Sequence, residues 1–466
     1  MRIGAVALVV ILGAPSLVHA QVAPPQAFTL EQAIQYAVDH YPTVRAALEE
    51  VNASRANVSI AQGAYLPRLD GLWQSNRASA NNVFGQLLPQ SVIPAMSGPV
   101  LPVSSGQSVW GSATGALLSW EPLDFGLRRA VVLEAEAVLS RARADEALIR
   151  LDVQRAVGDA FLRVLFTQRN VAVAQADVDR RGVLAGIAKA LVDNQLRPGA
   201  EASRADAERA AAQTRLIRAQ EAQMIAQAAL ARVLGVTTGS VAADPGRLFD
   251  AAPPTEVPTT GAATHPLALV RQAAVDAARA QQETLARTDL PRVYVQSSVF
   301  ARGSGADGNG HLDGGIGGLG LDRVNWAAGV QVVVPNLFDL GTLRARKAGA
   351  AASQRAEMAH YDEALLTVTA EQRTAEAVVQ ASRAIAANTP VQLTAAQQGE
   401  AQARARYQAG LTGITEVADA QSLLAQSEVD DQLARVDVWR ALLAAAAAEG
   451  NLAPFVGLIH STPGAP

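Results

Sequence analysis

The chain has 466 residues, of which 49% are hydrophobic and 18% are charged, and its formal net charge is −4. So small an acidic excess gives no electrostatic case for a nucleic-acid partner. The sequence contains no cysteine, which excludes disulfides, thiol catalysis and cysteine-type zinc sites.

The N-terminal residues follow the pattern of a secretory signal peptide. Met1-Arg2 is followed by an apolar run to Leu12 and then by Val18-His19-Ala20. These are the charged, apolar and small-residue regions of such a signal, so we expect residues 1–20 to be cleaved off. Gln21 does not offer the cysteine that a lipid-anchored protein needs at its new N-terminus. An exported protein without a lipid anchor is therefore expected.

An internal duplication organises the rest of the chain. Without a gap, Leu66-Pro67-Arg68 aligns with Leu290-Pro291-Arg292, 224 residues further on, and Tyr41-Pro42 aligns with His265-Pro266 at the same spacing. Each copy has the pattern helix, strand, loop, strand, long helix, helix. The predicted organisation is a first repeat over 21–243, a linker over 244–264, a second repeat over 265–450 and a C-terminal tail over 451–466.

Each repeat is predicted to contain a pair of strands. Alternation of apolar and polar residues places them at about 66–76 and 109–120, and again at about 290–300 and 324–334. In the third strand Val293 and Val295 share one face, and Tyr294 lies on the other. Such lengths suit a tilted barrel strand, which needs about 9 to 11 residues to cross a bilayer, but they also suit a soluble sheet with one wet face. Candidates for interfacial aromatic girdles are Trp73, Trp110, Trp120, Trp326 and Tyr294.

Each strand pair is followed by a predicted helical hairpin, over about 127–235 and about 342–450. The long, alanine-rich and charged helices are typical of coiled-coil packing. Pro390 is expected to break or kink the second long helix, because proline removes a helical hydrogen bond. Four strands in one chain cannot close a pore, and an open sheet edge is not viable in lipid, so a membrane-spanning form requires oligomerisation.

Several motifs then resemble a known family. They are Phe28-Thr29-Leu30-Glu31-Gln32-Ala33, Leu337-Phe338-Asp339-Leu340-Gly341, Arg406-Tyr407-Gln408-Ala409-Gly410-Leu411 and Asp419-Ala420-Gln421. In this order, together with the paired strand starts, they resemble the TolC-type outer-membrane efflux and secretion channels over essentially the whole mature chain.

The resemblance implies a mainly α fold with a transmembrane β-barrel contribution. Three chains would form a twelve-stranded barrel in the lipid of the outer membrane and a twelve-helix tunnel through the periplasm. The family acts as a passive exit duct without a cofactor. It docks onto a periplasmic adaptor that is served by an inner-membrane efflux pump or a type I secretion transporter.

The resemblance also implies a periplasmic gate near the second hairpin tip, formed here by Tyr407, Glu416 and Asp419. The two carboxylates are three residues apart and share a helix face, so in a trimer they would form acidic rings that favour cations. The alternative is an ordinary solvated helix face. Thr412 stands where some members carry a basic residue, which argues against a tyrosine–arginine latch at that position.

The two hairpin tips are candidates for the adaptor contact, and the alternative is that they are ordinary turns. The candidate residues are Leu196, Arg197, Pro198, Gly199, Gly410, Leu411 and Thr412.

An enzyme is not expected. The six histidines are scattered without metal-ligand spacing, and neither a Gly-x-Ser-x-Gly elbow nor a P-loop occurs. No metal site is predicted. The remaining alternative to a channel is a soluble periplasmic coiled-coil adaptor or scaffold. The duplicated hairpin, each copy carrying a strand pair long enough to cross a bilayer, favours the channel.

Overall fold

The computed structural model describes residues 27–83, 86–94, 99–101, 104, 106–237, 241–246, 248, 261–335 and 340–460. The predicted signal peptide, part of the predicted linker, Asp339 of the family motif and the last six residues lie outside this set. The chain divides into two compact units. One, here called the tip unit, takes the described parts of 1–36, 157–250 and 392–433; the other, the sheet unit, takes those of 37–156, 251–391 and 434–466.

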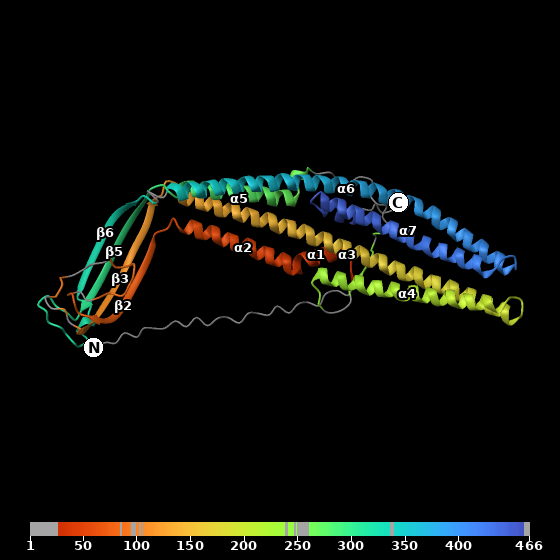
Figure 1. The fold of residues 1–466 in the computed structure, drawn as a ribbon, viewed down its shortest axis with the longest axis horizontal. Helices are drawn as coiled ribbons and strands as arrows, with labels where there is room; N and C mark the ends of the chain where they lie inside the picture. The colour runs from red at the N-terminus through yellow and green to blue at the C-terminus, as the bar shows by residue number, and fades with distance from the viewer. Residues whose placement is uncertain are drawn as a thin grey trace. The chain divides into compact units, whose positions relative to one another are not determined.

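The sheet unit contains one antiparallel sheet of four strands (Figure 1). They are β2 (Arg68–Ser79), β3 (Ser108–Leu123), β5 (Arg292–Ser304) and β6 (Arg323–Val333), in the order β2-β3-β5-β6. The second strand of the first repeat thus pairs directly with the first strand of the second repeat. β2 and β6 form the two edges, and each has a neighbour on one side only within the described chain.

Two helices of equal length lead into the two strand pairs. They are α2 (Pro42–Gly63) and α5 (Pro266–Arg287). Both begin with proline, whose fixed φ suits the first helical position and whose missing N–H is not needed there. His265 caps α5, because its Nδ1 accepts from the Leu267 N–H at 3.1 Å while Nε2 lies 3.1 Å from the Ala447 carbonyl.

The long helices run through both units. They are α3 (Leu127–Asp193) and α4 (Gly199–Leu234) in the first hairpin, and α6 (Leu340–Gln408) and α7 (Ile414–Ala448) in the second. A short C-terminal helix, α8 (Ala453–His460), packs Phe455 against Trp439 of α7 with ring centroids 6.3 Å apart. At 1.5 Å per residue, α3 is roughly 100 Å long. Among the residues that the structure describes, no helix combines the length and apolar character that a membrane crossing requires.

The start of the described chain lies in the tip unit. Helix α1 (Leu30–His40) opens with the capping box that its sequence predicts: the Gln32 side chain accepts from the Thr29 N–H, and the Thr29 hydroxyl accepts from the Gln32 N–H. A two-residue strand, β1 (Ala27–Phe28), pairs in parallel with β4 (Ala242–Ala243). This small sheet joins the beginning of the first repeat to its end, and alternation over two residues could not predict it.

Of the break or kink expected at Pro390, the break is wrong. Helix α6 continues through Pro390 for its whole 69 residues. Proline in a helix interior costs about 3 kcal/mol, but the helix on the C-terminal side remains packed against α7, where Gln392 donates to the Ser427 hydroxyl at 3.3 Å. Packing along a helix this long outweighs the local loss of one hydrogen bond.

Candidate functional site

One face of the sheet is almost entirely apolar in the half next to the helices, and it becomes polar toward the loops, where Thr114, Ser75, Ser112 and Arg77 lie on it. Side chains of directly paired residues lie on the same face, so the register fixes the two faces without ambiguity. The apolar face carries Leu69, Gly71 and Trp73 of β2, Ala116, Leu118 and Trp120 of β3, Val293, Val295, Ser297 and Val299 of β5, and Trp326, Ala328, Val330 and Val332 of β6. The polar face carries Arg68, Asp70, Gln74, Asn76, Ser119, Arg292, Tyr294, Gln296, Ser298, Asn325 and Gln331.

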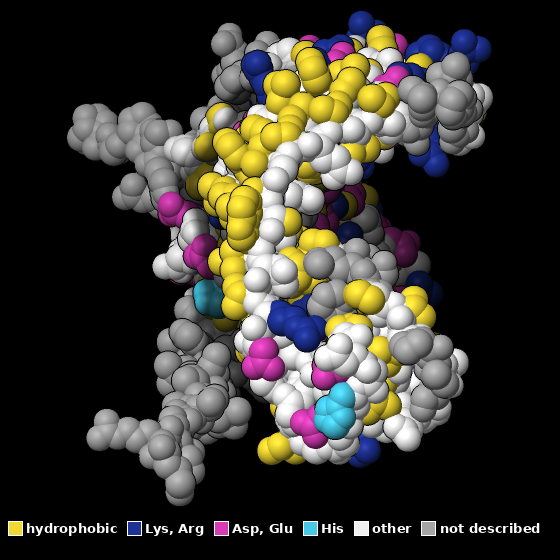
Figure 2. Space-filling view, turned by 90° about the vertical axis from the view of Figure 1, so that its left-hand side faces the viewer, with side chains coloured by type: hydrophobic (Ala, Val, Ile, Leu, Met, Phe, Trp, Pro, Cys, Tyr) yellow, Lys and Arg dark blue, Asp and Glu magenta, His cyan; other side chains and the backbone are white. Residues whose placement is uncertain are grey.

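The apolar face is open to its surroundings. Trp73 and Trp326 are 76% and 77% exposed, and Val330 is 70% exposed. Figure 2, which faces the sheet end of the view in Figure 1, shows hydrophobic side chains gathered into a continuous band. An exposed apolar surface of this extent marks contact with a partner or a membrane.

Four of the five predicted girdle aromatics, Trp73, Trp110, Trp120 and Trp326, lie on the apolar face, and one does not. Trp73 and Trp326 lie toward one end of it, and Trp120 lies toward the other, where its Nε1 donates to the Tyr65 carbonyl at 3.1 Å. Tyr294 pairs with Gln331 and lies on the polar face. Its assignment to an outer girdle is therefore wrong, because its side chain lies on the same face of the sheet as that of Arg292.

A buried ion pair fixes the junction between β3 and α3. Asp124 caps the helix by accepting from the Gly126 and Arg128 N–H groups at 3.0 and 2.7 Å, and it also accepts from Arg128 Nε at 2.8 Å. Burial raises the pKa of the Asp124 carboxyl, but the hydrogen bonds and charge of Arg128 and the Gly126 N–H outweigh it and hold that pKa below its usual value. The carboxylate therefore stays ionised, and the strand passes into the helix at a fixed angle.

The two hairpin tips are joined by three side chains and one backbone carbonyl, here called the tip cluster: Arg197, Glu201, Tyr407 and the carbonyl of Thr412. The Tyr407 hydroxyl donates to Glu201 Oε2 at 3.0 Å. The Arg197 guanidinium lies 5.4 Å from the centroid of the Tyr407 ring, and it donates to the Thr412 carbonyl at 2.9 Å. Arg197 also pairs with Glu201 at 3.5 Å. The first tip therefore supplies an arginine to the tyrosine of the second.

Tyr407 is only 1% exposed, in an apolar cluster that includes Leu184, Ile414 and Val417. Burial, followed by its hydrogen bond and charge interaction with Glu201, raises the pKa of Tyr407 to about 12. The hydroxyl is therefore a permanent donor at physiological pH. Glu201 was not predicted as a site residue, although it stands in the first repeat where Glu416 stands in the second.

The predicted acidic pair lies at the surface of the second hairpin. Glu416 and Asp419 are both exposed. Glu416 accepts from the Thr412 hydroxyl and pairs with Arg406 at 3.4 Å, whereas Asp419 makes no hydrogen bond or ion pair with another residue of the described ranges. The two carboxylates thus remain available to solvent.

The tip candidates differ in exposure. Leu196 and Leu411 are 69% and 72% exposed, whereas Arg197 is half-buried by its contacts in the tip cluster. The tips therefore leave leucine exposed and use arginine to hold the two turns together.

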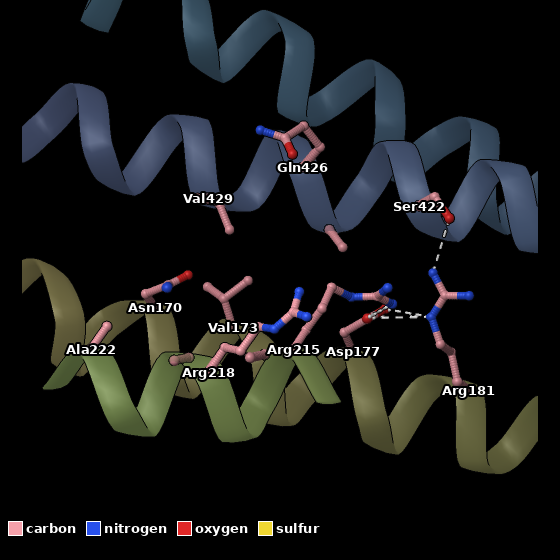
Figure 3. Close-up of a pocket in the computed structure, with 13 residues that line it drawn as sticks. Asn170, Val173, Asp177, Arg181, Arg215, Arg218, Ala222, Ser422, Gln426 and Val429 are labelled. Carbon is pink, nitrogen blue, oxygen red and sulfur yellow. Dashed lines mark hydrogen bonds and ion pairs between the residues drawn. The ribbon is translucent and has the colours of Figure 1, made fainter. Parts of the chain in front are cut away.

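A second polar group joins the hairpins further along the tip unit, and the sequence did not predict it. This arginine network consists of Asp177, Arg181, Glu208, Arg215 and Ser422. Figure 3 shows Asp177, Arg181, Arg215 and Ser422. Arg181, 1% exposed, contacts Asp177 at 3.1 Å, Glu208 at 2.8 Å and Ser422 at 3.0 Å. Arg215 reaches Asp177 at 2.9 Å. The network links α3 to α4 and to α7.

The outer membrane efflux protein family model matches residues 33–236 and 263–451. The chain belongs to this family. The match has two segments, which together cover most of the sequence. No match is found among curated protein sequences.

Solved structures share the fold of this efflux protein. The outer membrane protein VceC of Vibrio cholerae is 19% identical, with a TM-score of 0.70 over 91% of this chain and 96% of that one. The CmeC outer membrane channel of Campylobacter jejuni is 15% identical, with a TM-score of 0.72 over 90% and 85%. The MtrE outer membrane channel of Neisseria gonorrhoeae in its open state is 17% identical, with a TM-score of 0.71 over 91% and 89%.

Proposed function

We propose that this efflux protein is the outer-membrane exit duct of a tripartite efflux or type I secretion system. It is a passive channel that carries substrates from an inner-membrane pump, through a periplasmic adaptor, across the periplasm and the outer membrane. The observation that carries the proposal is the sheet, whose one continuous apolar face suits lipid while its opposite face suits water. Strands of 11 to 16 residues are long enough for the crossing.

The unit proposed is a homotrimer. Edge strands β2 and β6 cannot remain open in lipid, where each unsatisfied backbone group costs several kcal/mol. Pairing β2 of one chain with β6 of the next removes both edges, and three chains of four strands give a twelve-stranded barrel. The two hairpins of each chain would supply four of twelve tunnel helices. Export through a signal over residues 1–20, without lipidation, is part of this proposal, as is the division into repeats at 21–243 and 265–450.

The tips are the proposed contact with the adaptor. The exposed Leu196 and Leu411 support this role, because an apolar side chain at an exposed turn is a suitable anchor for a partner protein. A photo-reactive residue at position 411 should crosslink to the adaptor, and one at the exposed position 217 of α4 should not. Equal crosslinking at both positions would contradict a tip contact.

Glu416 and Asp419 are the proposed selectivity residues of the closed end. Changing both, as Glu416→Gln with Asp419→Gln, is expected to reduce the cation preference of the channel and its block by multivalent cations, because two acidic rings become neutral. Reversal potentials in planar bilayers under a salt gradient measure this. The control is Glu221→Gln, which removes an exposed carboxylate of α4 away from the tips. Unchanged reversal potentials would return both residues to an ordinary solvated face.

Fractionation tests the proposed function against the soluble adaptor or scaffold. The protein should remain with the outer membrane after a wash in high salt or alkali, and it should be released only by detergent. Recovery in the soluble periplasmic fraction would reject the channel.

A further inference from the structure

A cavity of about 590 Å³ lies next to the end of the sheet where β3 passes into α3 and α5 leads into β5. It lies between the first turns of α3 and the last turns of α5. Its charged lining consists of Arg129 from α3 and Asp276, Arg279, Glu283 and Arg287 from α5. Three guanidinium groups and two carboxylates give the lining a net charge of +1. The cavity therefore favours a ligand with one negative charge.

Arg129 is the residue that the fold itself does not explain. It lies in the first turn of α3, where the helix dipole disfavours a cation. Its neighbour Arg128 is accounted for by Asp124. Arg129 is exposed, and it makes no hydrogen bond or ion pair with any other residue that the structure describes. An anion in the cavity would satisfy Arg129 and would also suit the helix N-terminus.

The two α5 arginines that line the cavity, Arg279 and Arg287, form only long ion pairs. Arg279 lies 3.8 Å from Asp276, and Arg287 lies 3.8 Å from Glu283. Charge-assisted hydrogen bonds are about 2.7 to 2.9 Å long, so these exposed pairs contribute little and leave both guanidinium groups free to turn. Arg287 also donates to the Phe125 carbonyl at 3.3 Å. Gly126 permits this approach, because a Cβ there would lie 2.9 Å from Arg287 Nη1.

The apolar face of the sheet continues to the rim of this cavity. A register shift between Trp120 and Leu123 adds a residue to β3, so that Leu123 pairs with Val293 and joins the apolar face. Phe125 follows with a φ of 51°, which bulky residues rarely adopt, and is 51% exposed. A ligand in the cavity therefore meets arginine on one side and an exposed aliphatic and aromatic surface on the other.

We propose that this cavity binds the phosphodiester of an anionic glycerophospholipid, with Arg129, Arg279 and Arg287 on the phosphate and with Leu123 and Phe125 beside the acyl chains. The inference rests on the proposed function, since it requires the apolar face to lie in a bilayer. Trp120 on that face marks the depth of the interface, where aromatic residues gather. Arginines just beyond such a belt are at the level of the headgroups.

Native mass spectrometry of the purified full-length protein tests the site. Phosphatidylglycerol should be retained by the wild type. Phosphatidylcholine, which has the same phosphodiester but no net charge, should bind several-fold more weakly. The double change Arg129→Gln with Arg287→Gln should weaken phosphatidylglycerol binding by at least about tenfold. The matched control is Arg141→Gln with Arg150→Gln, two half-exposed arginines of the same helix in i,i+4 ion pairs, and it should bind as the wild type does.

The outcomes separate the lipid site from the channel. Equal retention of the two lipids, equal loss in the control variant, or displacement of phosphatidylglycerol by millimolar inorganic phosphate would overturn the lipid site. Conductance of the same preparations in planar bilayers is measured in parallel. If the wild type conducts and the arginine variant binds phosphatidylglycerol normally, the proposed lipid site is rejected and the proposed channel function is retained. If the wild type neither conducts nor retains lipid, both the lipid site and the channel function are rejected.

Discussion

Replacing Arg181 with methionine is expected to destabilise the tip unit by about 3 to 5 kcal/mol, the cost of removing one partner from a buried ion pair. Arg181 is 1% exposed and Asp177 is 3% exposed at its side chain. Without Arg181, Asp177 retains only Arg215 among its partners in the described ranges, and the Arg215 side chain is 47% exposed. Glu208 and Ser422 lose their contacts at the same time, so the attachment of α3 to both neighbouring helices weakens.

Hydrogen–deuterium exchange of α3 in the intact protein measures this effect. A loss of 3 kcal/mol corresponds to roughly 100-fold faster exchange where exchange follows local opening. Arg209→Met in α4 is the control, because Arg209 is exposed and has no ion-pair partner among the described residues; its effect should stay within about 0.5 kcal/mol. Adding Asp177→Leu to Arg181→Met should recover part of the loss, since it removes a buried carboxylate that has lost its buried partner. A wild-type exchange rate in Arg181→Met would show that the network does not stabilise the hairpins.

Tyr407→Phe combined with Arg197→Ser is expected to open the tip end of the channel. Together the two changes remove the hydrogen bond to Glu201, the contact with the aromatic ring and the bond to the Thr412 carbonyl. Bonds to charged groups contribute about 1.5 to 3 kcal/mol. For each chain, a loss of about 2 kcal/mol would raise the open population of its tip roughly 30-fold. Single-channel recordings would then show more and longer openings.

The matched control for this variant changes the same residue types, here both in α6, the helix that contains Tyr407. Tyr361 has no hydrogen-bond partner among the described residues, and Arg404 lies 3.9 Å from Glu400. Tyr361→Phe with Arg404→Ser should therefore conduct as the wild type does. If both double variants open equally, the tip cluster does not hold the closed end.

The raised pKa of Tyr407 makes the tip cluster sensitive to alkaline pH. Because burial and Glu201 raise that pKa to about 12, above the ordinary value near 10, the cluster contributes its full stability below about pH 10 and loses it as the pH rises through 12. Wild-type openings should increase over that alkaline range. The Tyr407→Phe variant should show no such increase.

Most of the fold follows from periodicity, and its exceptions have physical causes. Alternation identifies the four strands and their two faces because the register preserves it. It correctly puts Tyr294 on the face opposite Val293 and Val295, and the assignment of Tyr294 to a girdle overlooked that alternation. The β-bulge before Leu123 reverses the alternation there, and the insertion of one extra residue leaves no signal in a sequence. Pro390 shows the opposite case, in which long-range packing outweighs a strong local preference.

The site was predicted less completely than the fold. Tyr407 was identified from its motif, but its partners Glu201 and Arg197 lie about 200 residues earlier, and only tertiary structure brings them together. A signal for Glu201 did exist in the duplication, since it occupies the place of Glu416. The arginine network had no comparable signal, because charged residues on long helices are usually solvated.

Cysteine labelling along β6 tests the central claim most directly, namely that the sheet lies between lipid and a water-filled lumen. The chain has no cysteine, so each single substitution is read without background. A membrane-impermeant maleimide on outer-membrane vesicles should label cysteine at Asn325, Ala327, Gly329 and Gln331 of the polar face, and it should spare cysteine at Val324, Trp326, Ala328 and Val330. Labelling that alternates with a period of two residues is the predicted result. Equal labelling of both sets, as in a soluble sheet, would contradict the account.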